Sequence, residues 1–215
     1  MSEVVTERPL VVLVHGIWMS GVELLPLARS LRRAGFSSRI FRYTSLRRPL
    51  EDSAERLHEF IAGLAPGQLH LLGHSLGGLL ILELFDAHPV QPPGRVLFMG
   101  SPLAGSSVAR HLAARPGLRR MLGRAAPALV SEEFDWRGGR PVAMIAGSRG
   151  FGVGSLFGGL PEPNDGTVAV EETGAPWLDA HLTVPHSHFG MLFSPAVHRQ
   201  VVAWFRQGRF LAETA

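Results

Sequence analysis

Apolar residues follow two alternating patterns along the chain, one typical of strands and one typical of helices. Short apolar runs rich in β-branched residues predict buried strands, and apolar residues three or four positions apart predict amphipathic helices. The predicted strands are Leu10–Val14, Ser38–Tyr43, Gln68–Leu72, Arg95–Met99, Pro141–Ala146 and His181–Val184. The predicted helices contain Leu24 to Leu31, Ala54 to Leu64, Leu76–Ala87 and a C-terminal segment that begins at Ser194-Pro195. This alternation predicts an α/β protein with a mostly parallel sheet and helices on both faces.

Three local signals refine this pattern. Ser20 and Glu23 have the spacing of a capping box and predict the start of the first helix. Residues 147–163 are rich in glycine and lack a helical period, so we interpret them as a loop at the carboxyl end of a strand. Residues 104–139 are long for a connection between strands.

The segment 104–139 is also unusual in its charge. No acidic residue occurs between Asp86 and Glu132, so nearby acids are not expected to neutralise the arginines there. Apolar residues interleave with these arginines, as expected for an amphipathic surface segment: Leu112, Leu118, Met121, Leu122 and Leu129. Two interpretations stay open: a solvated flap, or a lid over an apolar acyl site that contacts an anionic lipid surface.

Composition narrows the class of protein. The length of 215 residues predicts a single domain over 1–215, with 104–139 as a candidate lid. The absence of cysteine excludes disulfides and thiol nucleophiles, and the absence of lysine excludes Schiff-base chemistry. A net charge of +3 is too small to predict nucleic-acid binding. Glu3 and Glu7 stand where a signal peptide is basic, and no membrane-spanning run is visible, so a cytoplasmic location is expected.

The strongest chemical signal is the run from Gly73 to Gly78, GHSLGG, which contains the G-x-S-x-G pattern around Ser75. A strand is predicted before it and a helix after it, which is the context of a nucleophile elbow. Such an elbow lifts the serine hydroxyl out of the sheet. We expect Gly73 and Gly77 to be required because a Cβ atom there would collide with neighbouring backbone.

A second signal follows the first predicted strand, in the run from His15 to Trp18. Acyl transfer needs two backbone N–H groups that bind the developing oxyanion. The residue after the nucleophile and a residue of this loop normally supply them, so Leu76 and Ile17 are the candidates. We interpret His15 as a structural residue that holds the loop.

An acid and a base follow Ser75 in the order Ser, Asp, His. Asp165 is the candidate acid, with Asp179 and then Asp135 as alternatives. The base lies in the run from His186 to Leu192, where His188 is favoured over His186. The H-x-H pair is also compatible with a metal site, but no third ligand has suitable spacing, so neither a metal nor another cofactor is predicted.

These motifs resemble those of the α/β-hydrolase superfamily, and in particular of small bacterial lipases and esterases. The similarity rests on the HG oxyanion loop, the GHSxGG elbow and a late H-x-G-x-L histidine, and it extends over roughly Pro9 to Phe205. Residues 100–106 also resemble the GTPH-x-GS turn of those lipases. The resemblance implies a minimal α/β-hydrolase fold with about six parallel strands. It further implies a triad of Ser75, Asp165 and His188, with the oxyanion hole at Ile17 and Leu76.

The expected activity is hydrolysis of carboxylic esters that carry an apolar acyl chain, through an acyl-enzyme on Ser75. A thioesterase, amidase or acyltransferase would use the same residues and stays an alternative. A non-catalytic, hydrolase-like binding protein is an alternative of another class. A nucleotide-binding interpretation of the glycines at 150, 152 and 154 lacks the G-x-G-x-x-G spacing.

Overall fold

The computed structural model describes residues 8–132, 134–150 and 160–212. In these ranges six strands form a sheet of order β2-β1-β3-β4-β5-β6, and every neighbouring pair is parallel. The strands are β1 Leu10–Val14, β2 Ser37–Phe41, β3 Leu69–His74, β4 Val96–Met99, β5 Val142–Gly147 and β6 Ala180–Val184. The predicted parallel sheet is therefore confirmed, with all six strands in sequence positions close to those expected.

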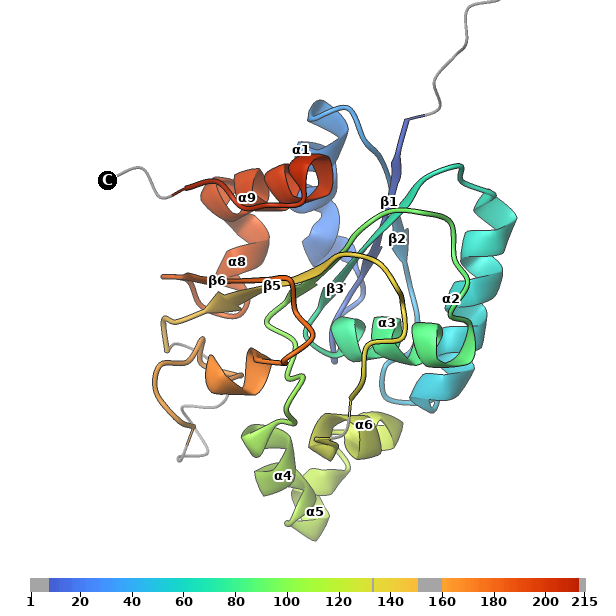
Figure 1. Cartoon of the computed structure of the whole chain (residues 1–215). Helices are drawn as coiled ribbons and strands as arrows, with labels where there is room; N and C mark the ends of the chain where they lie inside the picture. The colour runs from blue at the N-terminus through green and yellow to red at the C-terminus, as the bar shows by residue number, and fades with distance from the viewer. Residues whose placement is uncertain (1–7, 133, 151–159, 213–215) are drawn as a thin grey trace, which may run out of the picture.

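Helices cover both faces of the sheet (Figure 1). The strands are buried on both sides: Val12 and Val14 of β1 join one apolar cluster, and Val11 and Leu13 join the other. Helices α2 (Leu50–Leu64) and α3 (Leu76–Ala87) pack against the first cluster. Helices α1 (Leu25–Arg33) and α9 (Pro195–Gln207) and the short α8 (Gly190–Phe193) pack against the second. In the described ranges, no helix has both the length and the apolar character needed to cross a bilayer.

Residues 104–130 form a series of short helical segments that lie beside α3, at the bottom of Figure 1. They are α4 Ser107–Ala113, α5 Pro116–Arg119, the 3-10 turn Gly123–Ala125 and α6 Ala126–Val130. Leu112, Leu122 and Leu129 are buried in the same cluster as α2 and α3, whereas Met121 is 39% exposed. Burial against the body of the protein thus accounts for these three leucines. Movement of the segment as a lid stays a prediction.

Two local predictions are confirmed in part. The strand predicted over Ser38–Tyr43 is present as β2 Ser37–Phe41 and ends two residues earlier than predicted; Tyr43 lies beyond it and donates its hydroxyl to the His15 carbonyl at 3.0 Å. The capping box at Ser20 is incomplete. The Glu23 carboxylate accepts the Ser20 N–H at 3.1 Å, but Gly21 precedes a 3-10 turn and no side chain caps it.

The expected lack of acids beside the arginines of 104–139 is also corrected. Arg110 Nη1 lies 2.6 Å from Glu132 Oε1, so the acid that ends the acid-free stretch of the sequence contacts α4. Arg110 Nη2 also lies 4.0 Å from Glu172 Oε1, which comes from a 3-10 turn after the glycine-rich loop. Long-range folding thus supplies counter-charges that the local sequence does not contain.

The loops that contain the candidate site residues lie at the carboxyl edge of the sheet. The strand order reverses between β1 and β3, and α/β sheets bind ligands in the crevice at such a point. Val14 pairs with Gly73, so the loop after β1 and the turn at Ser75 leave adjacent strands at the same level. Asp165 and His188 follow β5 and β6 and reach the same edge.

Candidate active site

Ser75 occupies a strained turn between β3 and α3. Its φ of 55° and ψ of −126° lie in a region that residues with a Cβ atom rarely adopt. Its N–H donates to the Met99 carbonyl of β4 at 2.9 Å, and its carbonyl accepts from Gly78 at 3.0 Å. Backbone strain held in place by neighbouring strands is typical of functional turns.

Two glycines allow this turn to form. A Cβ atom on Gly73 would lie 2.5 Å from the Cα atom of Gly78, and one on Gly77 would lie 2.3 Å from the carbonyl oxygen of Val14. Both contacts are with backbone, which cannot move aside without disrupting β1 or α3. The prediction that glycine is required at both positions is therefore confirmed.

Asp165 and His188 form a tightly bonded, buried pair. His188 Nδ1 lies 2.6 Å from Asp165 Oδ2, and their exposed fractions are 3% and 1%. The His188 N–H also donates to the Asp165 carbonyl at 2.9 Å. The other carboxylate oxygen, Oδ1, accepts the N–H groups of Thr167 and Val168 at 2.9 and 2.7 Å. Because a carboxylate can only accept, the pair fixes the proton of His188 on Nδ1 and leaves Nε2 as the acceptor.

The alternative acids and base lie elsewhere. The Asp179 carboxylate accepts the Val142 N–H at 2.7 Å at the start of β5, which is the opposite edge of the sheet from Ser75. Asp135 lines a groove beside α3 together with Glu83 and Asp86. The His186 carbonyl accepts from Arg149 at 3.2 Å, and its buried Nδ1 has no partner among the described residues. The structure thus brings His188, rather than His186, to Asp165.

One predicted oxyanion donor follows Ser75 directly, and the other lies in the loop after β1. Leu76 is the first residue of α3, where a backbone N–H has no acceptor within the helix. Ile17 follows Gly16, and a Cβ atom on Gly16 would lie 2.9 Å from the Cβ of Ser75, so the loop after β1 touches the serine. The half-buried Ile17 N–H makes no hydrogen bond to a described residue.

His15 holds this loop through both ring nitrogens. Its Nδ1 lies 2.9 Å from the Gly16 carbonyl, and its Nε2 lies 3.4 Å from the Tyr43 N–H. Its ring stacks on the Tyr43 ring at 4.6 Å. Burial lowers its pKa below the ordinary value, which favours the neutral ring. This geometry agrees with the structural interpretation of His15.

His74 is a further residue of the site that the sequence motifs did not predict. It is fully buried, its ring lies 4.6 Å from the His188 ring, and its Nε2 lies 3.1 Å from the His188 carbonyl. A carbonyl can only accept, so Nε2 carries the proton and donates. Burial, followed by the nearby His188, holds the pKa of His74 well below its ordinary value. Its place in the G-x-S-x-G pattern, directly before Ser75, is the signal that could have identified it.

The described residues leave Ser75 Oγ without a hydrogen-bond partner and bring no three His, Asp or Glu side chains together as a metal site. Hydrogen bonds to a catalytic nucleophile often shorten only when substrate binds. The arrangement combines a strained serine, a buried Asp–His pair and two N–H groups that no described residue accepts. These are the parts needed for acyl transfer through a serine.

The glycine-rich pattern at 150, 152 and 154 lies outside the described residues except for Gly150.

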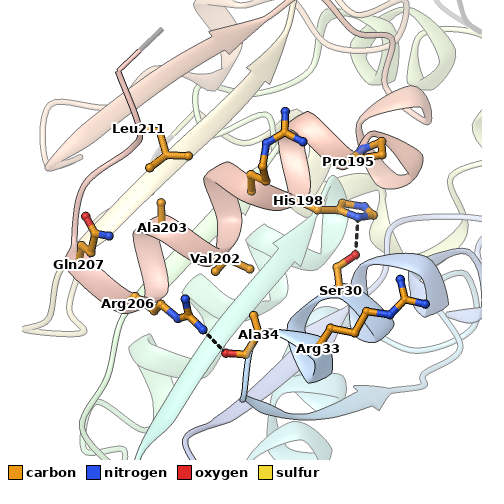
Figure 2. Close-up of a pocket in the computed structure, with 11 residues that line it drawn as sticks. Ser30, Arg33, Ala34, Pro195, His198, Val202, Ala203, Arg206, Gln207 and Leu211 are labelled. Carbon is orange, nitrogen blue, oxygen red and sulfur yellow. Dashed lines mark hydrogen bonds between the residues drawn. The ribbon is translucent and has the colours of Figure 1, made fainter. Parts of the chain in front are cut away.

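A separate cavity of about 490 Å³ lies between α1 and α9 (Figure 2). Ser75, Asp165 and His188 do not line it. His198 lies at its wall, with Nδ1 2.9 Å from Ser30 Oγ and Nε2 2.8 Å from the Leu192 carbonyl. Both ring nitrogens are therefore used to hold α9 against its neighbours.

Comparisons with solved structures place the fold among hydrolases. The mature lipase BlEst2 of Bacillus licheniformis is 19% identical, with a TM-score of 0.73 over 95% of this chain and 94% of that one. A pyrethroid hydrolase from Sphingobium faniae is 16% identical, with a TM-score of 0.66 over 93% and 98%. The carboxylesterase CesB of Bacillus subtilis is 17% identical, with a TM-score of 0.57 over 94% and 85%.

No curated protein matches the sequence. The family model described as the alpha/beta hydrolase family matches residues 11–213, which is nearly the whole chain; it contains the elbow, the Asp165–His188 pair and all six strands except the first residue of β1. The order and direction of the strands agree with the minimal fold that the sequence motifs imply. The chain therefore belongs to the alpha/beta hydrolase family.

Proposed function

We propose that the protein hydrolyses carboxylic esters through an acyl-enzyme on Ser75. The observation that carries this proposal is the buried pair of Asp165 and His188, with a separation of 2.6 Å, at the same sheet edge as the strained Ser75. The names lipase and carboxylesterase of the structural neighbours are consistent with an ester substrate. An ester with an apolar acyl chain is the substrate class that we favour.

The mechanism follows from the proton positions. His188 Nε2 takes the proton of Ser75 Oγ while the oxygen attacks the ester carbonyl, and the carbonyl electrons move to the oxyanion. The N–H groups of Ile17 and Leu76 bind that oxyanion, and each contributes roughly 3 kcal/mol to lowering the barrier. Collapse of the intermediate expels the alcohol, which receives the proton from His188. Water, deprotonated by His188, then releases the acid and restores Ser75. Throughout, Asp165 stabilises the charged imidazolium.

A panel of substrates tests the proposed reaction. We expect p-nitrophenyl esters to be hydrolysed, with kcat/KM rising as the acyl chain lengthens from acetate because more apolar surface is buried. Acyl-coenzyme A thioesters and p-nitroanilide amides form the other two arms. Turnover of the thioesters with negligible ester hydrolysis would replace the proposal by thioesterase activity. Absence of turnover in every arm, together with no reaction with a fluorophosphonate, would favour the non-catalytic binding protein.

His74 is expected to act as a positioning residue for the base. Replacing it by leucine removes the donor to the His188 carbonyl, and a shift of the base by even about 1 Å is expected to lower kcat by about 10- to 100-fold. KM should change little because His74 is buried away from substrate. His74→Gln keeps a side-chain N–H and is expected to restore most of kcat.

Measuring both stability and kinetics separates a positioning role of His74 from a merely structural one. Thermal unfolding of both variants measures the effect on stability, and steady-state kinetics on a p-nitrophenyl ester measures kcat and KM separately. Equal kcat in wild type and a folded His74→Leu variant would show that the hydrogen bond does not position the base.

A further inference from the structure

Six exposed arginines from two distant segments gather in two adjoining grooves. The first groove, of about 700 Å³, contains Arg47, Arg119, Arg120 and Arg124. The second, of about 570 Å³, contains Arg47, Arg48, Arg56 and Arg124. The shared members, Arg47 and Arg124, make the two grooves one surface. We call the six residues the arginine face: Arg47, Arg48, Arg56, Arg119, Arg120 and Arg124.

The fold fixes the two segments against each other. The Arg124 N–H donates to the Leu46 carbonyl at 2.9 Å. Gly123 has a φ of +55°, and a Cβ atom there would lie 2.3 Å from the same carbonyl oxygen. The close approach thus depends on glycine at this position. The arginine face is therefore a product of the fold, and the clustered charges repel one another at a cost that folding must offset.

Within the described residues, none of the six arginines of the face forms an ion pair. Among the described residues, the arginines in ion pairs are Arg110 and Arg137, neither of which belongs to the face. Asp52 is the acidic side chain among those that line the two grooves. Several unpaired guanidinium groups in one concave surface favour binding of phosphate or carboxylate oxygens from another molecule.

Exposed apolar side chains lie beside the arginine face, between it and the candidate active site. Met121 follows Arg119 and Arg120 directly and is 39% exposed. Its carbonyl accepts the indole N–H of Trp18 at 2.7 Å, and Trp18 is 44% exposed. Trp18 is the residue after Ile17, one of the two proposed oxyanion donors. The arginine face therefore adjoins the loop that leads to Ser75.

We propose that the arginine face docks the protein on an anionic lipid surface, with Trp18 and Met121 in contact with the lipid. Tryptophan and methionine beside arginine suit the boundary between headgroups and acyl chains. A fully aqueous ligand would bind the arginines but would not need exposed apolar side chains beside them. The arginines supply attraction to the headgroup phosphates. Docking would bring the loop of Ile17 and Trp18 to the surface from which an ester with an apolar acyl chain would come.

Docking can be measured without turnover and is therefore separable from the proposed hydrolysis. The test uses the full chain carrying Ser75→Ala, so that vesicle composition stays constant, and measures co-sedimentation with two kinds of vesicle. One kind contains phosphatidylcholine alone, and the other contains equal parts of phosphatidylglycerol and phosphatidylcholine. We expect binding to the anionic vesicles only, and a fall in that binding as sodium chloride rises from about 50 to about 300 mM.

Charge reversal locates the surface. Arg119→Glu with Arg120→Glu is expected to weaken binding at least about 30-fold, since each basic residue near an anionic surface contributes about 1 kcal/mol. Arg48→Glu with Arg56→Glu, at the other end of the face, provides a second pair in case the first disturbs folding. The matched control is Arg29→Glu with Arg199→Glu, which makes the same change in net charge on α1 and α9. Thermal unfolding checks that each variant is folded.

The outcomes separate the possible ligands. Equal weakening by the control pair would show a response to net charge alone, and equal binding to both kinds of vesicle would show that the arginines do not direct docking. Either result overturns the proposal. A third arm measures binding of pyrophosphate by calorimetry. Saturable pyrophosphate binding that depends on Arg119 and Arg120, without vesicle binding, would overturn lipid docking in favour of a soluble phosphorylated ligand.

Discussion

Ser75→Ala is expected to lower kcat/KM for a soluble p-nitrophenyl ester by about 10³-fold or more, because nucleophile and base act as a unit. The reason is local. Ser75 is the residue that the turn between β3 and α3 places in a strained conformation, at the positive end of the α3 dipole. Alanine fits the same backbone, so the folded structure is expected to persist. Initial rates at several substrate concentrations, with thermal unfolding in parallel, measure the effect.

Labelling identifies the nucleophile independently of rate. We expect a fluorophosphonate to modify wild type at Ser75, as mapped by peptide mass spectrometry, and to leave Ser75→Ala unmodified. Ser107→Ala is a suitable control because the Ser107 hydroxyl is buried without a partner in the described part of the chain, so its removal breaks no hydrogen bond. An adduct on a different serine, or full activity in Ser75→Ala, would rule out the assignment.

Much of the fold could be predicted because its signals are local. The strand Leu10–Val14 and the helix Leu76–Ala87 have the expected bounds, since an apolar run and a glycine turn delimit each of them. The glycines at 73 and 77 belong to the same class of signal. A turn that excludes a Cβ atom leaves its mark on the sequence at the positions where the backbones meet.

Features that depend on contacts between distant segments could not be predicted in this way. Tyr43 continues the alternating pattern of β2 but lies beyond the end of the strand, where its hydroxyl donates to the His15 carbonyl. His74 looks like an ordinary member of the motif until the fold brings the His188 carbonyl to its Nε2. Arg47 and Arg124 are 77 positions apart by their numbers, and only the packing of Leu46 against Gly123 joins them. Such contacts between distant segments leave no periodic pattern and no characteristic residue spacing in the sequence.

The second prediction with a large expected effect on kcat/KM concerns which of two histidines, His186 or His188, is the base. His188→Ala is expected to lower kcat/KM by about 10³-fold or more, because it removes the proposed base, the imidazole that is bonded to Asp165. His186→Ala should keep most of the activity, since the His186 carbonyl, which the substitution retains, makes the contact to Arg149. Both variants are assayed on the same ester. Loss of activity in His186→Ala with retention in His188→Ala would reverse the assignment of the base.

Asp165→Asn tests the bond between Asp165 and His188 by changing the acid instead of the base. Asparagine keeps an oxygen to accept the Thr167 and Val168 N–H groups, so the turn is expected to stay folded. Its amide would present an N–H to His188 Nδ1 and place the ring proton on Nε2, where it blocks proton transfer from Ser75. A loss of about 10⁴-fold in kcat is therefore expected. Asp179→Asn is the matched control, because asparagine there still accepts the Val142 N–H. If Asp179→Asn caused the larger loss, the acid of the triad would be Asp179, and the bond between Asp165 and His188 would be structural.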